Sequence, residues 1–267
     1  GNVALRKITD LGMTDYNYQR FSKLIKVPQG VLLVTGPTGS GKTTTLYAAL
    51  GELAKPNVNV VTVEDPVEKD IEGINQCQVN AKAGMTFAAA LRSILRQDPD
   101  IVMIGEMRDQ ETAEIAIRAA ITGHMVLSTL HTNDSASTVT RLVDMGVAPY
   151  MVATSLIGIV AQRLVKKICE DCRTPRMSTP EEDELMGISA PITIYDACGC
   201  PKCNNTGYTG RTAIHEVLTC TTEMSSLIAN GGKTDAIAAL AAKQGTKLLR
   251  DNVSELVQAG ETSIEEL

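Results

Sequence analysis

The sequence contains no tryptophan and only two phenylalanines among its 267 residues, and aromatic residues make up 3% of the chain. Proteins that bind single-stranded nucleic acid stack the bases on aromatic side chains, which are scarce here. An excess of positive charge is also lacking, since the formal net charge at pH 7 is -6. Proteins that wrap nucleic acid usually present a concentrated basic surface, so these two features argue against such a partner.

Long apolar runs are absent as well. None approaches the roughly 20 residues that a transmembrane helix requires, so no transmembrane segment is predicted. The first residues, Gly1 to Val3, contain neither an initiator methionine nor a signal peptide, and we interpret the chain as a fragment. A hydrophobic content of 43% and a charged content of 21% are typical of a globular protein. The length allows one large core and a smaller appendage.

Apolar runs alternate with stretches rich in helix-forming residues through the first half of the chain. The expected strands cover 31–34, 58–63, 101–104 and 125–129, and the expected helices cover 44–53, 87–95 and 111–120. Such alternation predicts an α/β fold in which a mostly parallel sheet carries helices on both faces. Ligands of these sheets bind at the carboxyl ends of the strands, so the residues that follow each strand are the candidates for function.

The rest of the chain gives weaker patterns. Residues 1–27 show no clean period and are interpreted as a lead-in or linker. Beyond Pro149 a helical pattern runs to about Leu164, and residues 175–191 are polar and interrupted. From Ser225 to the end the sequence is rich in alanine and helical in pattern.

A glycine-rich segment, GPTGSGKT, occupies residues 36–43 and matches the motif G-x-x-x-x-G-K-[ST] in full. It lies between an expected strand and an expected helix, which is the context that a phosphate-binding loop needs. Backbone N–H groups of such a loop point at the β-phosphate of a nucleotide, and the helix dipole adds positive potential. The predicted nucleotide-binding residues are Gly36, Pro37, Thr38, Gly39, Ser40, Gly41, Lys42, Thr43 and Thr44.

Two residues of this loop have expected roles in ATP chemistry. Lys42 is expected to reach the β- and γ-phosphates, and Thr43 to place its hydroxyl on Mg²⁺. On this motif alone, a glycine turn without a ligand and a small-molecule kinase remain alternatives.

Acidic residues follow two of the expected strands. Glu106 ends the run IVMIGE and is the candidate for holding Mg²⁺ or its water. Glu64, in VTVEDPVE, is the candidate base that polarises the attacking water. The neighbouring Asp65 precedes a proline and serves mainly to shape the turn. A helix cap or a solvated loop charge is the alternative for each carboxylate.

His131 follows the last expected strand, in the segment STLHTND. Its imidazole can donate a hydrogen bond to the γ-phosphate or to the reacting water, whereas the alternative is a structural hydrogen-bonding residue. Several arginines are solvated surface charges by default, and the functional alternative is contact with a phosphate in a neighbouring subunit. These are Arg92, Arg96, Arg108, Arg118 and Arg141.

Five of the seven cysteines fall within 35 residues. Cys169-x-x-Cys172 and Cys200-x-x-Cys203, 27 residues apart, form two pairs able to complete a tetrahedron around a structural Zn²⁺ ion. Disulfides and free buried thiols are the alternatives. Cys198 leaves the choice of ligands open, because it also lies close to Cys200. The two remaining cysteines, Cys77 and Cys220, are interpreted as ordinary core or surface residues.

Together these motifs resemble the hexameric ATPases of type II secretion and type IV pilus systems. The segment LVTGPTGSGKTTTLYAAL is similar to the Walker A region of that family, VTVEDPVE to its Asp box, and STLHTND to its His box. The segment LRSILRQDPDIVMIGEMRDQETAEIAIRAAITGH is similar to its Walker B region, and the likeness covers nearly all of the chain from Gly30 onward. The resemblance implies Glu64 as catalytic glutamate, Glu106 as the Walker B acid and His131 as the His-box residue, alongside Lys42.

The resemblance further implies a domain layout. A remnant of an N-terminal domain and a linker would occupy residues 1–27, and a RecA-like P-loop ATPase core residues 28–165. A small tetracysteine zinc subdomain would occupy residues 166–215, followed by a C-terminal helical subdomain at 216–267. By this resemblance we expect only a remnant of the family's N-terminal regulatory domains, around Val3 to Arg6, and we expect Arg6 to match an arginine through which that domain contacts nucleotide.

By the same likeness the chain is expected to be a cytoplasmic homo-hexamer, peripheral at the inner membrane, that uses ATP, Mg²⁺ and Zn²⁺. Its partner would be the inner-membrane platform protein of a pilus or secretion machine. Paired cysteines are typical of the extension and secretion branches, which favours pilus extension (PilB-like) with type II secretion (GspE-like) as the alternative. A RecA-like nucleic-acid translocase is the alternative from another class, and net charge disfavours it.

Overall fold

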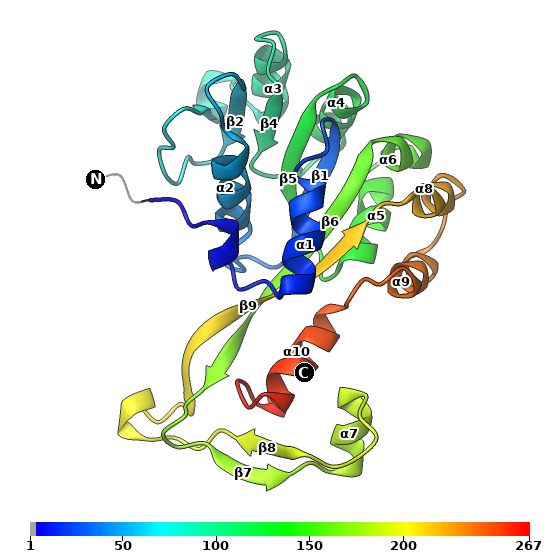
Figure 1. The fold of residues 1–267 in the computed structure, drawn as a ribbon. Coiled ribbons are helices and arrows are strands. Elements are labelled where there is room, and N and C mark those ends of the chain that lie inside the picture. Colours follow the sequence, from blue (N-terminus) through cyan, green and yellow to red (C-terminus); the bar gives the residue numbers. More distant parts are fainter. Residues whose placement is uncertain (1–3) are drawn as a thin grey trace.

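The computed structural model describes residues 4–267, so the part of the expected N-terminal remnant at Gly1 to Val3 lies outside the described residues. Its centre is a seven-stranded sheet of order β3-β2-β4-β5-β1-β6-β9 (Figure 1). These strands are β1 (Gly30–Thr35), β2 (Val60–Glu64), β3 (Asn75–Gln78), β4 (Ile101–Ile104), β5 (Met125–Leu130), β6 (Leu156–Ile168) and β9 (Tyr208–Thr219). All neighbouring strands are parallel except β9, which runs antiparallel to β6. The predicted α/β fold with a parallel sheet is confirmed.

Helices cover both faces of the sheet. They are α1 (Asp15–Leu24), α2 (Lys42–Leu53), α3 (Phe87–Leu95), α4 (Gln110–Ile121), α5 (Ser135–Asp144), α6 (Pro149–Ser155), α8 (Thr222–Ala229), α9 (Thr234–Lys243) and α10 (Leu249–Gln258), with the shorter α7 (Pro180–Met186) farther away. Strand β1 divides the core, because alternate side chains of a strand point to opposite faces. Val31 and Leu33 pack with α3 to α6, whereas Leu32 and Val34 pack with α1 and α2.

The lead-in segment contains helix α1, which the sequence patterns did not predict. Phe21 and Leu24 are buried on the same side of the sheet as α2. The helix comes so close to β6 that a Cβ atom at Gly158 would lie 2.6 Å from the Leu24 side chain. Residues 15–24 therefore belong to the packed core in this structure, while the expected domain boundary at residue 27 stays a prediction.

The helical pattern expected from Pro149 to about Leu164 is wrong beyond Ser155. Helix α6 ends there, and the chain continues directly as strand β6 between β1 and β9. A continuous apolar run does not separate a helix from a strand that is buried on both faces. The run from Ile157 to Val165 contains several β-branched residues, and these favour the strand.

Strands β6 and β9 continue beyond the sheet as a long antiparallel ribbon (Figure 1). At its far end lie the four motif cysteines, the hairpin of β7 (Thr174–Met177) and β8 (Thr193–Asp196), and α7. Helix α10 packs beside the ribbon and fills a third core with Val165, Met186, Ile194, Ile214 and its own Val253. The cysteine region and the C-terminal helix therefore share one core.

None of the helices described is both long enough and apolar enough to cross a membrane.

Candidate functional site

The glycine-rich segment forms the turn between β1 and α2, and α2 begins at Lys42. Gly41 precedes the helix with φ of 88°, a left-handed conformation that glycine adopts without strain. At Gly36 a Cβ atom would lie 2.3 Å from the backbone oxygen of Gln162. Glycine at these two positions therefore allows the loop to curl tightly against β6.

Gln162, in β6, binds the loop through its side-chain amide. The sequence patterns do not predict this role. Gln162 Nε2 donates a hydrogen bond of 2.7 Å to the backbone oxygen of Ser40, and its Oε1 accepts one of 2.5 Å from the Thr45 hydroxyl. The Gln162 residue is only 3% exposed. The one signal in the sequence is a single amide within an apolar run, and a buried amide needs partners.

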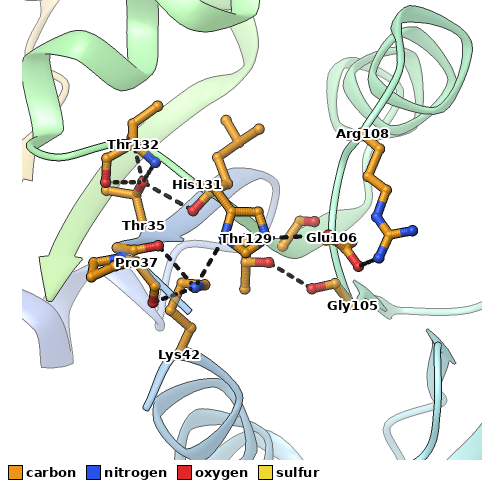
Figure 2. Close-up of polar contacts among 12 residues, drawn as sticks. Thr35, Pro37, Lys42, Gly105, Glu106, Arg108, Thr129, His131 and Thr132 are labelled. Carbon is orange, nitrogen blue, oxygen red and sulfur yellow. Dashed lines mark hydrogen bonds and ion pairs between the residues drawn. The ribbon is translucent and has the colours of Figure 1, made fainter. Parts of the chain in front are cut away.

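Lys42 folds its ammonium group back onto the loop. Its Nζ donates hydrogen bonds of 2.9 Å and 3.0 Å to the backbone oxygens of Gly36 and Pro37, and lies 3.5 Å from Nδ1 of His131 (Figure 2). Burial lowers the pKa of Lys42, and the nearby Glu106 carboxylate opposes this effect. The ammonium is thus already placed at the mouth of the loop, where a phosphate would replace the two carbonyl oxygens.

Glu106 follows β4 and has two cationic or polar neighbours. One carboxylate oxygen lies 2.5 Å from an Arg108 guanidinium nitrogen, and the other lies 3.3 Å from Nε2 of His131 (Figure 2). Burial alone would raise the pKa of Glu106, but the hydrogen bonds and charge of Arg108 and His131 outweigh burial and hold it below its ordinary value. The carboxylate is therefore ionised at neutral pH and suited to a cation.

Glu64, at the end of β2, is 2% exposed and receives three hydrogen bonds. The Tyr47 hydroxyl donates to one oxygen, while the Thr62 hydroxyl at 2.6 Å and the Gln76 amide at 3.0 Å donate to the other. Burial and the contact with Glu64 raise the pKa of Tyr47. A carboxylate accepts about four hydrogen bonds, so one acceptor position of Glu64 remains for a further donor.

The expected catalytic side chains line one cavity of about 250 Å³. Its wall includes Lys42, Glu64, Glu106 and His131. Thr38, Gly39, Gly41 and Thr43 also line it, whereas Gly36, Pro37 and Ser40 of the loop and Thr44 of α2 do not. Lys42 and His131, 89 positions apart in the sequence, thus meet at one space beside the loop.

Two other expectations concern arginines. Arg6 lines a different and larger hollow of about 560 Å³ between the lead-in segment and α2, and the structure does not bring it to the loop cavity. The five arginines named for contact between subunits are all exposed. Arg108 pairs with Glu106, and Arg92 lies 2.5 Å from the Glu111 carboxylate on the surface.

The buried Ser40 hydroxyl tests whether the loop fits a nucleotide. It has no hydrogen-bond partner among the described residues, and it lies in the turn that the glycines make. The Lys42 ammonium and the N-terminus of α2 supply hydrogen-bond donors beside the cavity, as a triphosphate requires. Thr43 and Glu106 add the oxygen ligands that Mg²⁺ prefers. The residues present therefore fit Mg-ATP.

The four motif cysteines form a second, separate site at the end of the β6–β9 ribbon. The sulfur atoms of Cys169, Cys172, Cys200 and Cys203 all lie within 4.8 Å of one another. Cys198 is exposed and outside this group, with its sulfur 2.8 Å from the Thr174 hydroxyl. A cluster of four thiols at such distances fits a tetrahedral zinc site.

Backbone N–H groups prepare this cluster for negative charge. Gly207 N and Cys200 N each donate to the Cys203 sulfur at 3.2 Å, and Gly199 N donates to Cys172 at 3.3 Å. Burial opposes ionisation of Cys203, but the backbone N–H groups of Cys200 and Gly207 and the neighbouring thiols lower its pKa to about 6, whereas burial raises the pKa of Cys172. Thiolates are the form that binds metal, so the donor set matches Zn²⁺.

The chain matches a family model described as "Type II/IV secretion system protein" over residues 1–267. It is 49% identical to a type II secretion system ATPase E of Vibrio cholerae over all of this chain and 53% of that protein. It is 46% identical to the type IV pilus assembly ATPase PilB of Thermus thermophilus, over 98% of this chain and 30% of that protein. The chain spans about half the length of the secretion relatives it matches.

A solved structure of a pilus motor has a similar fold. The pilus retraction motor PilT with bound ADP superposes with a TM-score of 0.74 and 29% identity, over 99% of this chain and 66% of that one. The family model and the relatives cover the whole chain, including the loop, both glutamates, His131 and the four cysteines. The chain therefore belongs to the type II/IV secretion system protein family.

Proposed function

We propose that this chain binds Mg-ATP in the loop between β1 and α2 and hydrolyses it, as the ATPase region of a secretion or pilus motor. The observation that carries the proposal is the meeting of Lys42, Glu64, Glu106 and His131 at one cavity beside the loop. Membership of the family and the ADP bound to PilT support it. A chance glycine turn offers no such set of groups from four separate segments.

Each side chain at the cavity has a separate role in binding the nucleotide. The Lys42 ammonium moves from two loop carbonyls onto the β- and γ-phosphates and neutralises charge there. The Thr43 hydroxyl and the ionised Glu106 carboxylate would hold a magnesium ion or its water. Such an ion would supply positive charge that neutralises the phosphates. His131, between Lys42 and Glu106, donates a hydrogen bond toward the γ-phosphate.

Glu64 is the residue that orients the attacking water and receives its proton. Three donors from Tyr47, Thr62 and Gln76 fix the carboxylate, and the remaining acceptor position is left for that water. Glu106 is less suited to this role, because Arg108 and His131 lower its pKa and thereby its basicity. The two carboxylates thus serve as base and metal-side ligand.

The wider role concerns the whole protein. We infer a cytoplasmic homo-hexamer at the inner membrane, whose ATP cycle drives assembly of pilins or pseudopilins through a membrane platform protein. The sequence motifs favoured pilus extension, whereas identities of 48–50% with type II secretion proteins against 46% with PilB favour type II secretion slightly. Restoring either pilus extension or protein secretion in a deletion strain separates the two.

We also infer that the four clustered cysteines hold a structural Zn²⁺ ion. Their mutual distances and the backbone donors to Cys172 and Cys203 support this assignment. Four thiolates leave no open coordination position, so this metal takes no part in hydrolysis.

Release of phosphate from Mg-ATP by the purified chain tests the proposal. We expect slow, magnesium-dependent hydrolysis that DNA or RNA does not stimulate, and its loss in Lys42→Ala. The exposed Lys55, just beyond the same helix, supplies the matched control Lys55→Ala, which is expected to hydrolyse ATP as the parent does. A chain with no affinity for Mg-ATP, or a Lys42→Ala variant that turns over normally, would contradict the proposal.

A further inference from the structure

Glu216, in β9, is a buried carboxylate that the proposed chemistry does not use. It is 2% exposed and pairs with Ala161, the residue of β6 next to Gln162. One carboxylate oxygen accepts hydrogen bonds from the backbone N–H of Ser135 at 2.8 Å and from the Ser135 hydroxyl. The other accepts a bond of 3.0 Å from the backbone N–H of Leu249. One side chain thus links two segments that are far apart in the sequence.

Both donors are the first residues of helices. Ser135 opens α5, four positions after His131, and Leu249 opens α10 in the C-terminal part of the chain. The N-cap residue of α10, Leu248, has no side chain that can accept a hydrogen bond, so Glu216 takes over the capping of that helix. Two helix N-termini are therefore directed at one carboxylate.

Glu216 lies beside a cavity, so few apolar contacts join α5 to α10 near it. A cavity of about 500 Å³ lies between α5, the β6–β9 ribbon, α9 and α10, and Glu216 lines it. Where apolar packing is incomplete, relative movement of the two sides meets little steric resistance. At the wall of this cavity, one Glu216 oxygen bonds to the first residue of α5 and the other to the first residue of α10. Asn252 of α10 adds a second polar contact, donating 2.6 Å to the backbone oxygen of His215.

The α5 side of the link continues into the nucleotide cavity. Thr132 joins His131 to the start of α5, and its backbone N–H donates 3.0 Å to the Thr35 hydroxyl at the end of β1. The short segment 131–135 thus connects a side chain of the nucleotide cavity to the first residue of α5. Since both Glu216 oxygens belong to one rigid group, a change at Ser135 changes the bond to Leu249.

We propose that Glu216 is a positioning residue that couples the loop carrying His131 to helix α10, so that the occupied nucleotide cavity and the C-terminal helix take up matched positions. The part about nucleotide rests on the proposed function, whereas the link between α5 and α10 does not. This difference allows the two to be tested separately.

Backbone amide exchange without nucleotide tests the link itself. Ser135→Ala removes only the hydroxyl bond to Glu216, and Ser135 donates no hydrogen bond to α10. We expect exchange at residues 249–252 to become about threefold faster in Ser135→Ala. In Glu216→Gln we expect it to become about tenfold faster, because the side-chain NH₂ group of glutamine cannot accept a hydrogen bond from a backbone N–H. Glu255→Gln, on the exposed side of α10, is the control and should leave residues 249–252 unchanged. Unchanged exchange at α10 in Ser135→Ala would overturn the link.

The nucleotide arm uses the same four proteins with a Mg-ATP analogue that is not hydrolysed. In the parent we expect the analogue to change exchange at residues 249–252, and in Glu216→Gln this change should vanish while affinity for the analogue stays within about threefold. Turnover per bound nucleotide should fall about tenfold with KM unchanged. A Glu216→Gln variant that keeps the nucleotide-dependent change would refute the coupling. If the parent binds no nucleotide, the proposed function fails, and the Ser135→Ala result still decides whether the link exists.

Discussion

The loop cavity and the cysteine cluster are both built from short spaced motifs, but they are arranged in opposite ways. At the cavity Lys42, Glu64, Glu106 and His131 face a space of about 250 Å³. At the cluster the four sulfur atoms face one another within 4.8 Å. An exchangeable ligand requires side chains that are held by the protein yet open on one side, whereas a permanent ion requires every ligand to point inward.

The means of support differ accordingly. Other side chains hold the cavity residues, as Tyr47 of α2, Thr62 of β2 and Gln76 of β3 do for Glu64. At the cluster, nearby backbone N–H groups such as those of Gly199 and Gly207 perform this role. The open site therefore depends on long-range packing, while the closed site depends mainly on its own loops and on the metal that they fit.

Removing one sulfur ligand should have the largest effect and should separate the two regions. We expect Cys203→Ser to lose most of its bound zinc, because the ion contributes on the order of 10 kcal/mol to folding of such modules. Zinc content by mass spectrometry and amide exchange of residues 166–215 measure the loss. Nucleotide affinity should change less than about threefold, since the cavity has its own supports.

Cys198→Ser is the matched control for this experiment. Cys198 is exposed and lies outside the cluster, so its variant should keep one zinc per chain. Equal zinc loss in both variants would mean that Cys198 is a ligand and that the assignment of the cluster is wrong.

A change at Glu64 should abolish chemistry at the open site and leave the closed one intact. Glu64→Gln keeps the volume of the side chain but cannot take a proton, so we expect turnover to fall about 10³-fold. Nucleotide affinity and zinc content should remain at the level of the parent chain. Phosphate release at saturating Mg-ATP measures turnover, and binding of a fluorescent nucleotide measures nucleotide affinity.

Glu72→Gln provides the comparison for that variant, because Glu72 is exposed on the segment that follows β2. It should behave as the parent chain. Normal hydrolysis by Glu64→Gln would show that another group receives the proton, and Glu106 would be the next candidate.

Gln162 tests how far the open site depends on the strand that also leads to the cysteines. Gln162→Ala leaves the Ser40 carbonyl without its Gln162 donor and the Thr45 hydroxyl with the Gly41 backbone oxygen, at a cost of about 2 kcal/mol for buried polar groups. We expect affinity for Mg-ATP to fall about tenfold or more, measured by titration, with zinc content unchanged. Gln29→Ala, at an exposed position before β1, is the control. Unaltered affinity in Gln162→Ala would mean that the loop is rigid by itself.

Much of this arrangement could be predicted from the sequence, for a physical reason. Buried parallel strands such as 31–34 and 101–104 are short apolar runs followed by polar residues, and the phosphate loop and cysteine pairs have fixed local spacing. Local patterns suffice where neighbours in sequence are also neighbours in space.

The missed features involve partners that are distant in sequence. Gln162 contacts Ser40 across 122 positions, and Glu216 contacts Ser135 across 81. The sequence of β6 predicts a helix, because burial on both faces removes the alternation that identifies a strand. Helix α1 has a weak pattern of its own and is fixed by the contact of Leu24 with Gly158. The fold class follows from local patterns, whereas the supports of the site follow only from the tertiary structure.

The smallest expected effect concerns a support of the closed region other than its metal. Arg176 donates hydrogen bonds of 2.6 and 2.7 Å to the two oxygens of Glu182 and one of 2.7 Å to Asp196. The Arg176 contact lowers the pKa of Glu182 to about 2, from an ordinary value of 4.5. A carboxylate whose pKa is lower in the folded state stabilises that state above its ordinary pKa and loses this contribution as pH falls toward the folded value. The contribution of Glu182 is therefore complete at neutral pH and disappears between about pH 4.5 and 2.

Glu182→Gln should consequently lower the free energy of unfolding by about 1 kcal/mol at pH 7, as expected for a paired but partly exposed group. The difference between this variant and the parent should shrink as the pH falls below 4.5, which denaturant titration at several pH values measures. Release of zinc in acid affects both proteins alike and cancels in the comparison. Glu181→Gln removes an exposed neighbouring charge and should show no such pH dependence. A difference that stays constant down to pH 3 would mean that Glu182 acts through its shape rather than its charge, and that the metal is the main electrostatic support of the closed region.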